Sequence, residues 1–570
     1  MATETISIEK NQSRVDEIAL SISPASITAG SEANAMEAFK PNYRFWLVFL
    51  AFAVLTLMVA IDSTSLSVAL SIIAQKLHGT AIEAFWAGTS FLLASTVFQP
   101  SFASFSHIFG RRPLVYTSLI LFLLGTLIGA TAKDFTLLLV GRSVQGVGGG
   151  GIVSLTDIII TDLVPLRLRG NYVGIISSQW AIGSVMGPVI GGAFAQKGFW
   201  RGIFYLNLPF IIVGWVMVFL FLELNIISSP LASKLRRVDF IGTLLFVGGT
   251  TSFLLGLSWG GVLHPWTSAQ TLVPIFAGVA SIMSFVIYEA KLAREPLIPL
   301  SLFDTTTANV AYLIDALHGC ILWCLLYYLP LYFEAVQGYR PIIAGVALFP
   351  ETFTVAPLAI ITGCLVSKTG KYRWAILSGF ALTTVGVFLN LRLDINTSIP
   401  AWIFLTTVSG IGLGMLFGSM EFAVQAASSD EDQAFAVATF SFFRTFGQAI
   451  GVAVGGVVFQ NQMMKNLRGS KYFAADAREL AKDAAALVQL IKDTADTEQK
   501  LELRLAYMRS LRTIFIVLGA ISFISFLLSF FIRDYDMDRA LTGHQGFKEK
   551  LSPQDEEQTI MVANEQIPNI

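Results

Sequence analysis

Seven ionisable side chains interrupt long apolar segments of the chain, where a charge is expensive. They are Asp62, Arg142, Asp315, His318, Glu351, Glu421 and Arg444. A charge at the middle of a bilayer costs about 3 kcal/mol on insertion scales, so one that persists usually faces a cavity or a charged partner. An acid in a cavity can take up and release protons, and a permanently charged arginine nearby can expel the proton. These residue types therefore predict proton exchange inside a membrane.

The acids also have purely structural explanations. Asp62 either exchanges protons or pairs with a residue of a neighbouring helix. Asp315 and His318 lie three residues apart on one helix face, so they either bond to each other or bind a substrate or proton. Asp157 and Glu421 are expected near the inner ends of helices, where access to water lowers the cost of a charge. The sequence alone leaves both explanations open.

A substrate of such a protein would occupy a cavity with apolar walls and a few polar groups. The residues expected to line it are Gln145, Trp180, Asp315, His318, Glu351 and Arg444. Arg444 fits contact with substrate and bonding between helices equally well. The aromatic residues Trp86, Phe442 and Phe446 either join this lining or pack against helices and lipid.

The composition places these residues in a membrane protein. Of 570 residues, 54% are hydrophobic and 14% are charged, whereas soluble proteins carry roughly 25% charged residues. The net charge of −1 gives no electrostatic reason to expect a nucleic-acid partner. Residues 1–44 and 537–570 are polar, so we expect two flexible cytoplasmic tails and no cleavable signal peptide.

No cofactor or metal is expected. Three cysteines lie in apolar runs and five histidines are dispersed, which argues against a metal centre or a membrane-embedded enzyme. The pattern Gly146-x-Gly148-x-x-Gly151 fits the dinucleotide fingerprint, but it lies inside an apolar segment and predicts close helix packing instead. The sequence contains no Gly-x-x-x-x-Gly-Lys-Ser/Thr, so it offers no phosphate loop for an ATP-driven pump.

The apolar segments are long enough to cross a membrane, which takes about 20 mostly apolar residues. Fourteen segments qualify, near 45–69, 85–106, 114–132, 136–160, 171–194, 203–223, 239–259, 271–289, 307–329, 341–366, 374–391, 401–426, 434–460 and 513–532. Short loops on one side carry twelve Lys and Arg residues and those on the other side six, so both termini are expected in the cytoplasm.

Two features are then expected outside. The sequon at Asn396 would be open to N-glycosylation. The outer loop 461–512 has an amphipathic pattern that predicts one or two surface helices. These helices form either a cap over the outer vestibule or a connector at the membrane surface.

Two inner loops share one spacing of residues. The string ASFSHIFGRR at 103–112 aligns without gaps on GCLVSKTGKYR at 363–373, and each follows an apolar span, the second and the tenth. Repeated halves are typical of secondary transporters, whose substrate site lies between the halves. The repeat therefore predicts two six-helix bundles, 45–223 and 291–536, with two inserted helices in the linker 224–290.

Four motifs resemble the major facilitator superfamily. ASFSHIFGRR resembles the family's loop motif Gly-x-x-x-Asp-Arg-x-Gly-Arg-Arg, LLLVGRSVQGVGGG (137–150) its span-4 arginine motif, and GSVMGPVIGG (183–192) its span-5 antiporter motif. AIDSTSLSVAL (60–70) resembles the span-1 motif of the fourteen-span drug:proton antiporters. WRGIFYLNLP (200–209) and YYLPLYFEAVQG (327–338) add a likeness to fungal toxin and multidrug efflux pumps. The resemblance implies the major facilitator fold and proton coupling through Arg142, with Asp62 as its acid.

The span-5 motif also has a physical interpretation. Its residues are Gly183, Gly187, Pro188, Gly191 and Gly192. Three of the glycines recur every four residues, so they form a face on which another backbone can approach closely in lipid. The proline can bend the helix. We expect this flat, bent face to seal one half of the protein against the other.

The resemblance implies a cytoplasmic latch between the halves, built around the repeated loops. Its expected residues are His107, Gly110, Arg111, Arg112, Asp157, Asp162, Lys368, Gly370 and Lys371. His107 stands where the family motif has aspartate, and a histidine that is mostly neutral at cytosolic pH cannot supply a fixed anion. We therefore hypothesise that Arg111 or Arg112 pairs with Asp157 or Asp162.

The sequence thus predicts an all-α polytopic membrane protein with the major facilitator fold and fourteen spans. We expect a monomer in the plasma membrane, or a vacuolar or vesicle membrane, that exports amphipathic organic compounds by alternating access and proton antiport. The alternatives are a proton-coupled importer of a metabolite or siderophore, and a receptor that transports nothing.

Overall fold

The computed structural model describes residues 41–78, 81–224, 230–261, 263–481 and 484–539. Most of both predicted tails lies outside the described residues. The first group of helices is α3 (Tyr43–Lys76), α4 (Ala81–Phe109), α5 (Arg111–Thr131), α6 (Phe135–Leu163), the 3₁₀ turn η1 (Leu166–Leu168), α7 (Arg169–Gln196) and α8 (Gly202–Phe221). We call it the N-terminal half.

The linker and the second group follow. The linker region contains α9 (Leu231–Arg237), α10 (Phe240–Trp259) and α11 (Ala269–Lys291). The C-terminal half comprises η2 (Leu300–Phe303), α12 (Thr306–Leu331), the π-helical turn η3 (Tyr332–Val336), α13 (Pro341–Ala347), α14 (Phe349–Thr369), α15 (Arg373–Leu389), η4 (Asn390–Arg392), α16 (Ile399–Ala427), α17 (Gln433–Arg468), α18 (Ala477–Leu480), α19 (Ala484–Asp493) and α20 (Thr497–Ser529).

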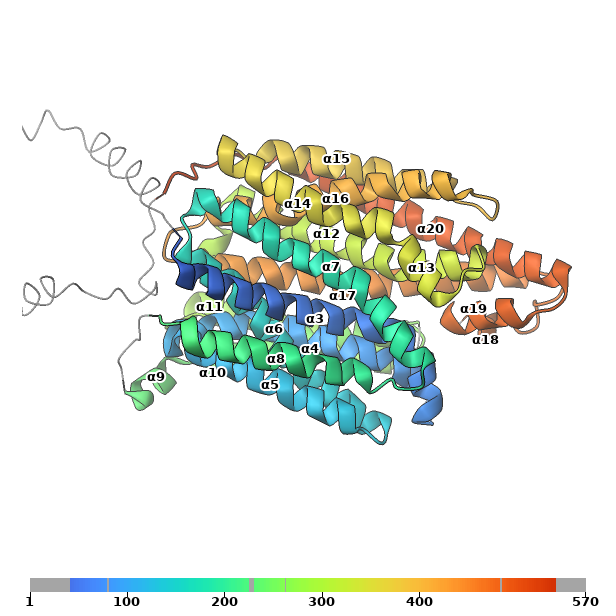
Figure 1. The fold of residues 1–570 in the computed structure, drawn as a ribbon, viewed down its shortest axis with the longest axis horizontal. Coiled ribbons are helices and arrows are strands. Elements are labelled where there is room, and N and C mark those ends of the chain that lie inside the picture. The colour runs from blue at the N-terminus through green and yellow to red at the C-terminus, as the bar shows by residue number, and fades with distance from the viewer. Residues whose placement is uncertain (1–40, 79–80, 225–229, 262, 482–483, 540–570) are drawn as a thin grey trace, which may run out of the picture.

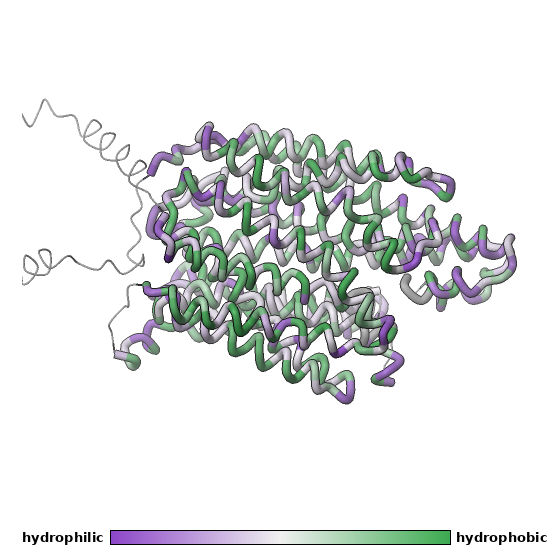
Figure 2. Tube along the Cα trace, in the orientation of Figure 1, coloured by the Kyte–Doolittle hydropathy of each residue, from purple (hydrophilic) through white to green (hydrophobic). Residues whose placement is uncertain are grey.

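The protein is an all-α polytopic membrane protein. In lipid, backbone polar groups must bond within their own segment, which selects helices for the long apolar runs. Thirteen described helices are long and apolar enough to span a membrane, and Figure 2 shows their apolar middles and polar ends. The one predicted span outside these thirteen is the second segment, 85–106, which corresponds to α4 and whose Ser, Thr, Gln and Pro residues lower its hydropathy. It nevertheless packs within the bundle, against α6 and α17.

Two predicted boundaries were wrong. The segment 341–366 is divided into α13 and α14 at Leu348, just before Pro350, which belongs in a first helical turn. Much of the predicted outer loop 461–512 belongs to longer helices, because α17 continues to Arg468 and α20 begins at Thr497. Adding residues to an existing helix is easier than starting a new one, so charged residues outside the membrane can extend these two helices.

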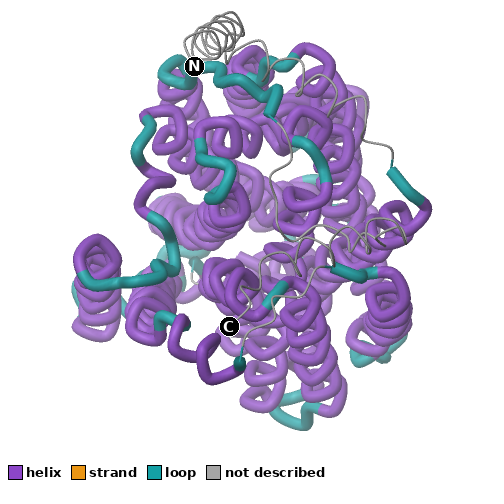
Figure 3. Tube along the Cα trace, turned by 90° about the vertical axis from the view of Figure 1, so that its left-hand side faces the viewer, coloured by secondary structure: helices purple, strands orange, loops and turns teal. Residues whose placement is uncertain are grey.

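The two halves lie side by side with their helices running in the same general direction (Figure 1). They meet where α7 packs on α14 and where α4 packs on α17. We call the end at which α3 begins with Tyr43 and α20 ends with Ser529 the terminal face, and the opposite end the far face. Figure 3 looks along the helices from the terminal face.

The inserted pair α10–α11 lies beside the contact between α4 and α17, because α10 touches both helices. Three ring pairs join it to the halves: Trp86–Trp259, Phe246–Phe442 and Phe253–Phe446. Of the aromatic residues considered for a substrate cavity, Trp86, Phe442 and Phe446 thus pack against α10.

The glycine face of α7 packs on α3, inside the N-terminal half. A Cβ added to Gly187 would lie 2.0 Å from Thr64 Oγ1, and one added to Gly191 would lie 1.9 Å from the carbonyl oxygen of Ser65. The expectation that this face seals the two halves was therefore wrong. That contact is made nearer the terminal face, where Gly170 of α7 meets the backbone of Gly363 in α14.

Replacing Gly191 with valine is expected to lower the thermal stability of the detergent-solubilised protein by several degrees or to prevent folding. The new side chain would collide with backbone atoms of α3, and overpacking of this kind costs about 1–3 kcal/mol or more. Gly248→Ala is the matched control, because a Cβ there meets nothing within 4 Å. Equal melting temperatures for the two variants would contradict the packing described.

Candidate functional site

A fully buried ion pair lies inside the N-terminal half. Arg142 Nη1 lies 2.5 Å from Asp62 Oδ2, and neither side chain is exposed to solvent. The guanidinium also donates from Nε to the carbonyl of Ala87 and lies 4.4 Å above the ring of Phe91. The two residues come from α6 and α3, which contact each other. The structure therefore brings together the two residues predicted to couple protons.

Two amides complete the surroundings of Asp62. Gln145 Nε2 donates to Asp62 Oδ1 at 3.0 Å, and Asn207 Nδ2 donates to the same oxygen at 2.7 Å. Gln145 Oε1 accepts from Arg142 at 2.7 Å. Both oxygens of the Asp62 carboxylate thus accept from buried side chains, Oδ2 from Arg142 and Oδ1 from the two amides. Asn207 was missed by the sequence analysis, although an amide within the apolar segment 203–223 was the available signal.

A cavity lies between the two halves, with about 850 Å³ of space free of protein atoms, including open solvent at its mouth. Its walls come from α3, α6 and α7 on one side and from α12, α14, α16 and α17 on the other. The polar residues that line it are Thr56, Asp157, Ser177, Ser184, Thr352, Glu421, Ser441, Arg444, Thr445 and Gln448. The remainder of the lining is apolar and includes Trp180 and Trp323. Its mostly apolar lining with a few polar groups is typical of sites that bind small organic molecules.

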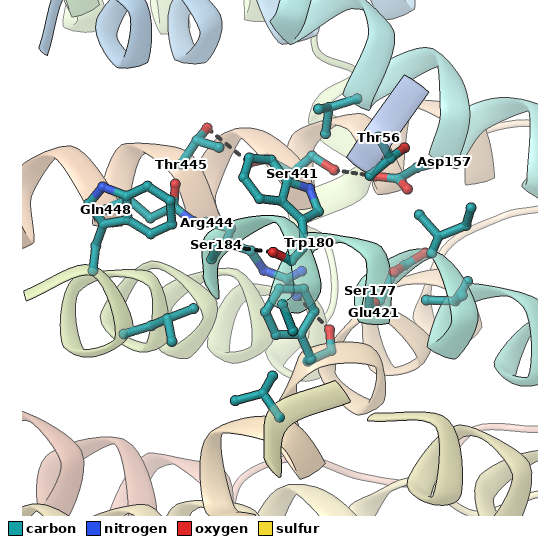
Figure 4. A pocket seen from close by; sticks show the side chains of 18 of the residues that line it. Thr56, Asp157, Ser177, Trp180, Ser184, Glu421, Ser441, Arg444, Thr445 and Gln448 are labelled. Atoms are coloured by element: carbon teal, nitrogen blue, oxygen red, sulfur yellow. Dashed lines mark hydrogen bonds between the residues drawn. The ribbon is translucent and has the colours of Figure 1, made fainter. Parts of the chain in front are cut away.

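Arg444 is the cation of this cavity (Figure 4). Its Nε lies 3.1 Å from Asp315 Oδ1, and its Nη2 donates to the carbonyl of Phe417 at 2.7 Å. The guanidinium lies between the rings of Phe417 and Phe440, 4.4 and 4.5 Å from their centres. Asp315 is fully buried, whereas 13% of the Arg444 side chain is exposed. Arg444 is thus held in place from behind while it faces the cavity.

Two acids from opposite halves also face the cavity. Asp157 of α6 accepts a hydrogen bond from Ser441 Oγ of α17 at 2.8 Å (Figure 4). Glu421 of α16 accepts from Gln425 Nε2 at 2.7 Å. The cavity therefore contains groups that can bear either charge.

The predicted cavity residues are distributed between the lining and its support. Trp180 and Arg444 belong to the lining, whereas Gln145 and Asp315 do not: Gln145 bonds to Asp62, and Asp315 accepts from Arg444. His318 does not bond to Asp315, since neither ring nitrogen has a hydrogen-bond partner among the described residues, and its ring lies against Phe417. Glu351 is 1% exposed, and both carboxyl oxygens lack a partner in the described part of the chain.

The predicted latch contains one of the hypothesised pairs. Arg111 Nε lies 2.9 Å from Asp162 Oδ2, with both residues buried. Arg112 instead donates to the carbonyl of Phe219 at 2.9 Å, and Asp157 faces the cavity. His107 is exposed, 5.5 Å from the ring of Phe435 in α17. Asp162 therefore supplies the anion that His107 cannot.

Each of the two repeated loops turns at a glycine whose φ angle is positive. Gly110 has φ of 97° and Gly370 has φ of 66°, a region that strains any side chain with a Cβ. The last turn of α14 meets the other half through its backbone, because the carbonyls of Ser367 and Lys368 accept hydrogen bonds from Arg167. The structure gives no polar contact of the Lys371 side chain, which is exposed.

Two arginines of the N-terminal half join the halves at the terminal face. Arg167 donates to these two carbonyls of α14 and, through Nη1, to both carboxylate oxygens of Asp538 at 2.6 and 2.8 Å. Arg169 is 3% exposed and donates from Nη1 to Gln425 Oε1 at 2.6 Å and to Gln433 Oε1 at 2.7 Å. In the sequence both arginines are among the twelve basic residues of the inner loops, which indicate only the orientation of the chain. Their bonds close the terminal face.

The start of the predicted C-terminal tail is ordered against the C-terminal half. Met537 is 1% exposed, and Arg539 donates to the carbonyls of Ala426 and Ser428 at the end of α16. Asp538, between them, is the acid that holds Arg167. The described beginning of this segment is thus part of the contact between the halves.

Asp538→Asn is expected to increase the population with an open terminal face about two- to fivefold, because a partly exposed ion pair contributes roughly 0.5–1 kcal/mol. The population can be measured from the distance between two spin labels by double electron–electron resonance, with labels at Tyr43→Cys and Asp304→Cys. These positions are exposed at the terminal face, one in each half. Asp394→Asn is the control, since Asp394 pairs with Arg512 inside one half. An unchanged distance distribution for Asp538→Asn would show that the pair does not hold this face closed.

At the far face, α19 covers the end of the C-terminal half. Its residues Leu487 and Ile491 are buried in the main hydrophobic cluster of that half. Lys492 also lies 3.1 Å from Glu334 of η3. The predicted amphipathic segment therefore packs on one half. Asn396, the predicted glycosylation site, is exposed at the same face.

Comparisons with known proteins agree with this arrangement. The sequence pattern of the Major Facilitator Superfamily matches residues 52–452. The chain is 50% identical over 533 residues to MFS transporter L2 of Phoma sp., covering 94% of this chain and 89% of the relative. It is 36% identical over 521 residues to efflux pump FUS6 of Gibberella moniliformis, covering 90% and 92%. The acurin A biosynthesis cluster MFS-type transporter of Aspergillus aculeatus is 34% identical over 519 residues, covering 89% and 93%.

Solved structures share the fold at low sequence identity. The human organic anion transporter MFSD10 (TETRAN) superposes with a TM-score of 0.55 at 14% identity, covering 86% of this chain and all of that one. The proton:xylose symporter XylE superposes with a TM-score of 0.54 at 12% identity, covering 87% and 98%.

Proposed function

Because the chain belongs to the major facilitator superfamily and is a membrane transporter, we propose that it exports amphipathic organic compounds in exchange for protons. The observation that carries this proposal is the cavity between the halves, flanked by the buried Asp62–Arg142 pair. Several similar proteins are named efflux pumps, and one belongs to a cluster that makes a secondary metabolite. We infer that this chain exports a fungal metabolite or toxin of that kind.

The transport cycle is alternating access. Contacts from the cavity to the terminal face, made by Arg167, Arg169 and Ser441, hold the halves together there. Substrate can pass that face only when these bonds break. The two halves must therefore move relative to each other around the cavity.

Asp62 is the coupling acid. A proton and Arg142 compete for the same carboxylate, because Arg142 occupies Oδ2 while the two amides occupy Oδ1. Protonation removes the anion and leaves a buried guanidinium without its partner, a costly state that favours rearrangement of α3 against α6. Release of the proton restores the pair. Each turn of this exchange links proton movement to the conformation of the N-terminal half.

The cavity selects amphipathic substrates. Its apolar walls would bury the body of the molecule, and Arg444 would bind an acceptor group such as a carboxylate, phenolate or carbonyl. The acids Asp157 and Glu421 would bind a donor. We place the terminal face in the cytoplasm of a monomer in the plasma membrane, since the basic loops lie on that side.

The proposal is tested with purified protein in liposomes that carry a pH gradient, using a panel of neutral, anionic and permanently cationic amphipathic compounds. Antiport moves a compound toward the acidic compartment, whichever way the protein is inserted. Accumulation on the alkaline side would indicate proton symport and import. If the pH gradient drives no more accumulation of any compound than it does in protein-free liposomes, the coupling proposal fails.

A further inference from the structure

One acid in the cavity is connected to the contact between the halves through a single side chain. Glu421 lines the cavity and is 5% exposed. Its Oε1 accepts from Nε2 of Gln425, one helical turn further along α16, at 2.7 Å. Gln425 is 1% exposed, and its own Oε1 accepts from Arg169 Nη1 at 2.6 Å. The chain Glu421–Gln425–Arg169 therefore runs from the cavity to the other half of the protein.

The amide of Gln425 has a direction, because one end only donates and the other only accepts. In this structure the donor end points to Glu421 and the acceptor end points to Arg169. Reversing the amide would place its NH₂ group against the guanidinium, where two donors face each other and no hydrogen bond forms. The orientation of Gln425 thus decides whether Arg169 is bonded to α16.

Loss of the Gln425 bond would weaken the contact that Arg169 makes between the two halves. Its Nε and Nη2 donate to the carbonyls of Val164 and Thr161, at the end of α6 in its own half. Among the described residues, its bonds to the C-terminal half come only from Nη1, to Gln425 and Gln433. The guanidinium stays fixed to α6 and η1 whether or not the C-terminal half is attached.

We propose that Gln425 is a positioning residue that transmits the protonation of Glu421 to the terminal face, an inference that rests on the proposed proton antiport. Ionised Glu421 only accepts, so it holds the amide in the observed direction and keeps Arg169 bonded. Protonated Glu421 donates its O–H to Gln425 Oε1, the amide reverses, and the Arg169 bond is lost. Proton uptake into the cavity therefore favours opening of the terminal face, and proton release favours closure.

This direction matches an export cycle. Protons entering from outside would open the cytoplasmic side, where they leave and substrate enters. The other charged groups that act on Glu421 are Asp157 of α6, Asp315 of α12, Arg444 of α17 and Arg169 of α7. Asp157 and Asp315 already have polar partners other than Gln425. Of the three acids, Glu421 is the one that bonds to the Gln425 amide in the described residues.

The test compares two glutamines that accept from the same arginine atom. Gln425 and Gln433 lie at 2.6 and 2.7 Å from Arg169 Nη1, but only Gln425 bonds to Glu421. The protein, without substrate in lipid nanodiscs, carries spin labels at Tyr43→Cys and Asp304→Cys, with Cys320, Cys324 and Cys364 replaced by alanine. The open fraction of the terminal face is measured at pH values between about 8 and 5.5.

The wild type is expected to show a ratio of open to closed protein that rises roughly tenfold or more as the pH falls, because one charge-assisted hydrogen bond of about 1.5–3 kcal/mol is lost. Gln433→Leu should be more open at every pH and keep this rise. Gln425→Leu should lose the rise. The isosteric Gln425→Glu should lose it while staying closed, since its carboxylate accepts from Arg169 in either orientation.

A pH-dependent rise that persists in both Gln425 variants would overturn the relay, as would a wild type that shows no rise. Transport by the wild type along a pH gradient is measured separately. If the wild type shows transport driven by the pH gradient, but both Gln425 variants keep the pH-dependent open fraction, the relay is refuted and proton antiport stands. Gln425→Glu keeps the size of the side chain, so the test survives a Gln425→Leu protein that fails to fold.

Discussion

Asp62→Asn is expected to abolish transport driven by a pH gradient while the protein still exchanges substrate across the membrane. The asparagine keeps the size of the side chain but cannot bind and release a proton, so coupling is lost without loss of the cavity. Gradient-driven uptake should fall to the level of protein-free liposomes, whereas exchange of labelled for unlabelled substrate at equal pH should continue. A variant that still accumulates substrate on the acidic side would contradict the assignment of Asp62.

The matched control is Asp315→Asn. Asp315 is also fully buried and also bonds to an arginine, at 3.1 Å. It serves to position Arg444, so its loss should change affinity and leave a response to the pH gradient. Breaking either buried pair costs about 3–5 kcal/mol. If Asp62→Asn does not fold, the double variant Asp62→Asn with Arg142→Gln removes both charges together and should fold without coupling.

Arg444→Gln is expected to raise the KM for substrates that carry an acceptor group roughly 10- to 150-fold, the range that corresponds to a lost charge-assisted hydrogen bond of about 1.5–3 kcal/mol. The maximal rate should change little, because Arg444 contacts neither Asp62 nor the arginines of the terminal face in the described structure. Initial rates over a range of substrate concentrations separate the two parameters. A lower maximal rate with an unchanged KM would place Arg444 in the conformational cycle instead.

Neutral amphipathic compounds without an acceptor provide an internal control for Arg444. Their KM should be unaffected by the substitution, since the apolar walls of the cavity remain. Arg111→Gln provides a second control, because Arg111 pairs with Asp162 away from the cavity. A KM shift of similar size in that variant would indicate a general structural effect.

Much of the fold could be predicted because lipid leaves the backbone few choices. Apolar runs of about 20 residues must become helices, and the all-α membrane architecture follows. The boundaries that failed depend on interactions that hydropathy does not record. Pro350 ends one helix and begins the next, and polar residues continue α17 and α20 beyond the apolar region.

The candidate site was predictable in its residue types and less so in its pairings. The resemblance to the major facilitator superfamily matched Asp62 with Arg142, whereas burial alone says only that each charge needs some partner. For Asp315 the sequence offered a bond to His318, three residues away, as one of two alternatives, because helical spacing is visible in a sequence. It bonds instead to Arg444, 129 residues further on, in a helix that tertiary packing brings alongside.

The contacts at the terminal face were the hardest to predict. Arg169 and Gln425 are 256 residues apart, and Gln425 carries no charge to draw attention to it. The glycines at 183, 187 and 191 were correctly seen as a packing face, but spacing alone cannot say which helix approaches it. Only the arrangement of helices assigns that face to α3 and gives Gly170 the contact with the other half.

Proton antiport is tested most directly by counting the protons released when a substrate binds. Calorimetric titration of the solubilised protein, in buffers with different ionisation enthalpies, uses whichever compound of the panel accumulates in the liposomes. Competition between proton and substrate requires the wild type to release about one proton or more per molecule bound, by the reciprocity of linked binding. Asp62→Asn should release fewer. Substrate binding without proton release, or with proton uptake, would contradict the account.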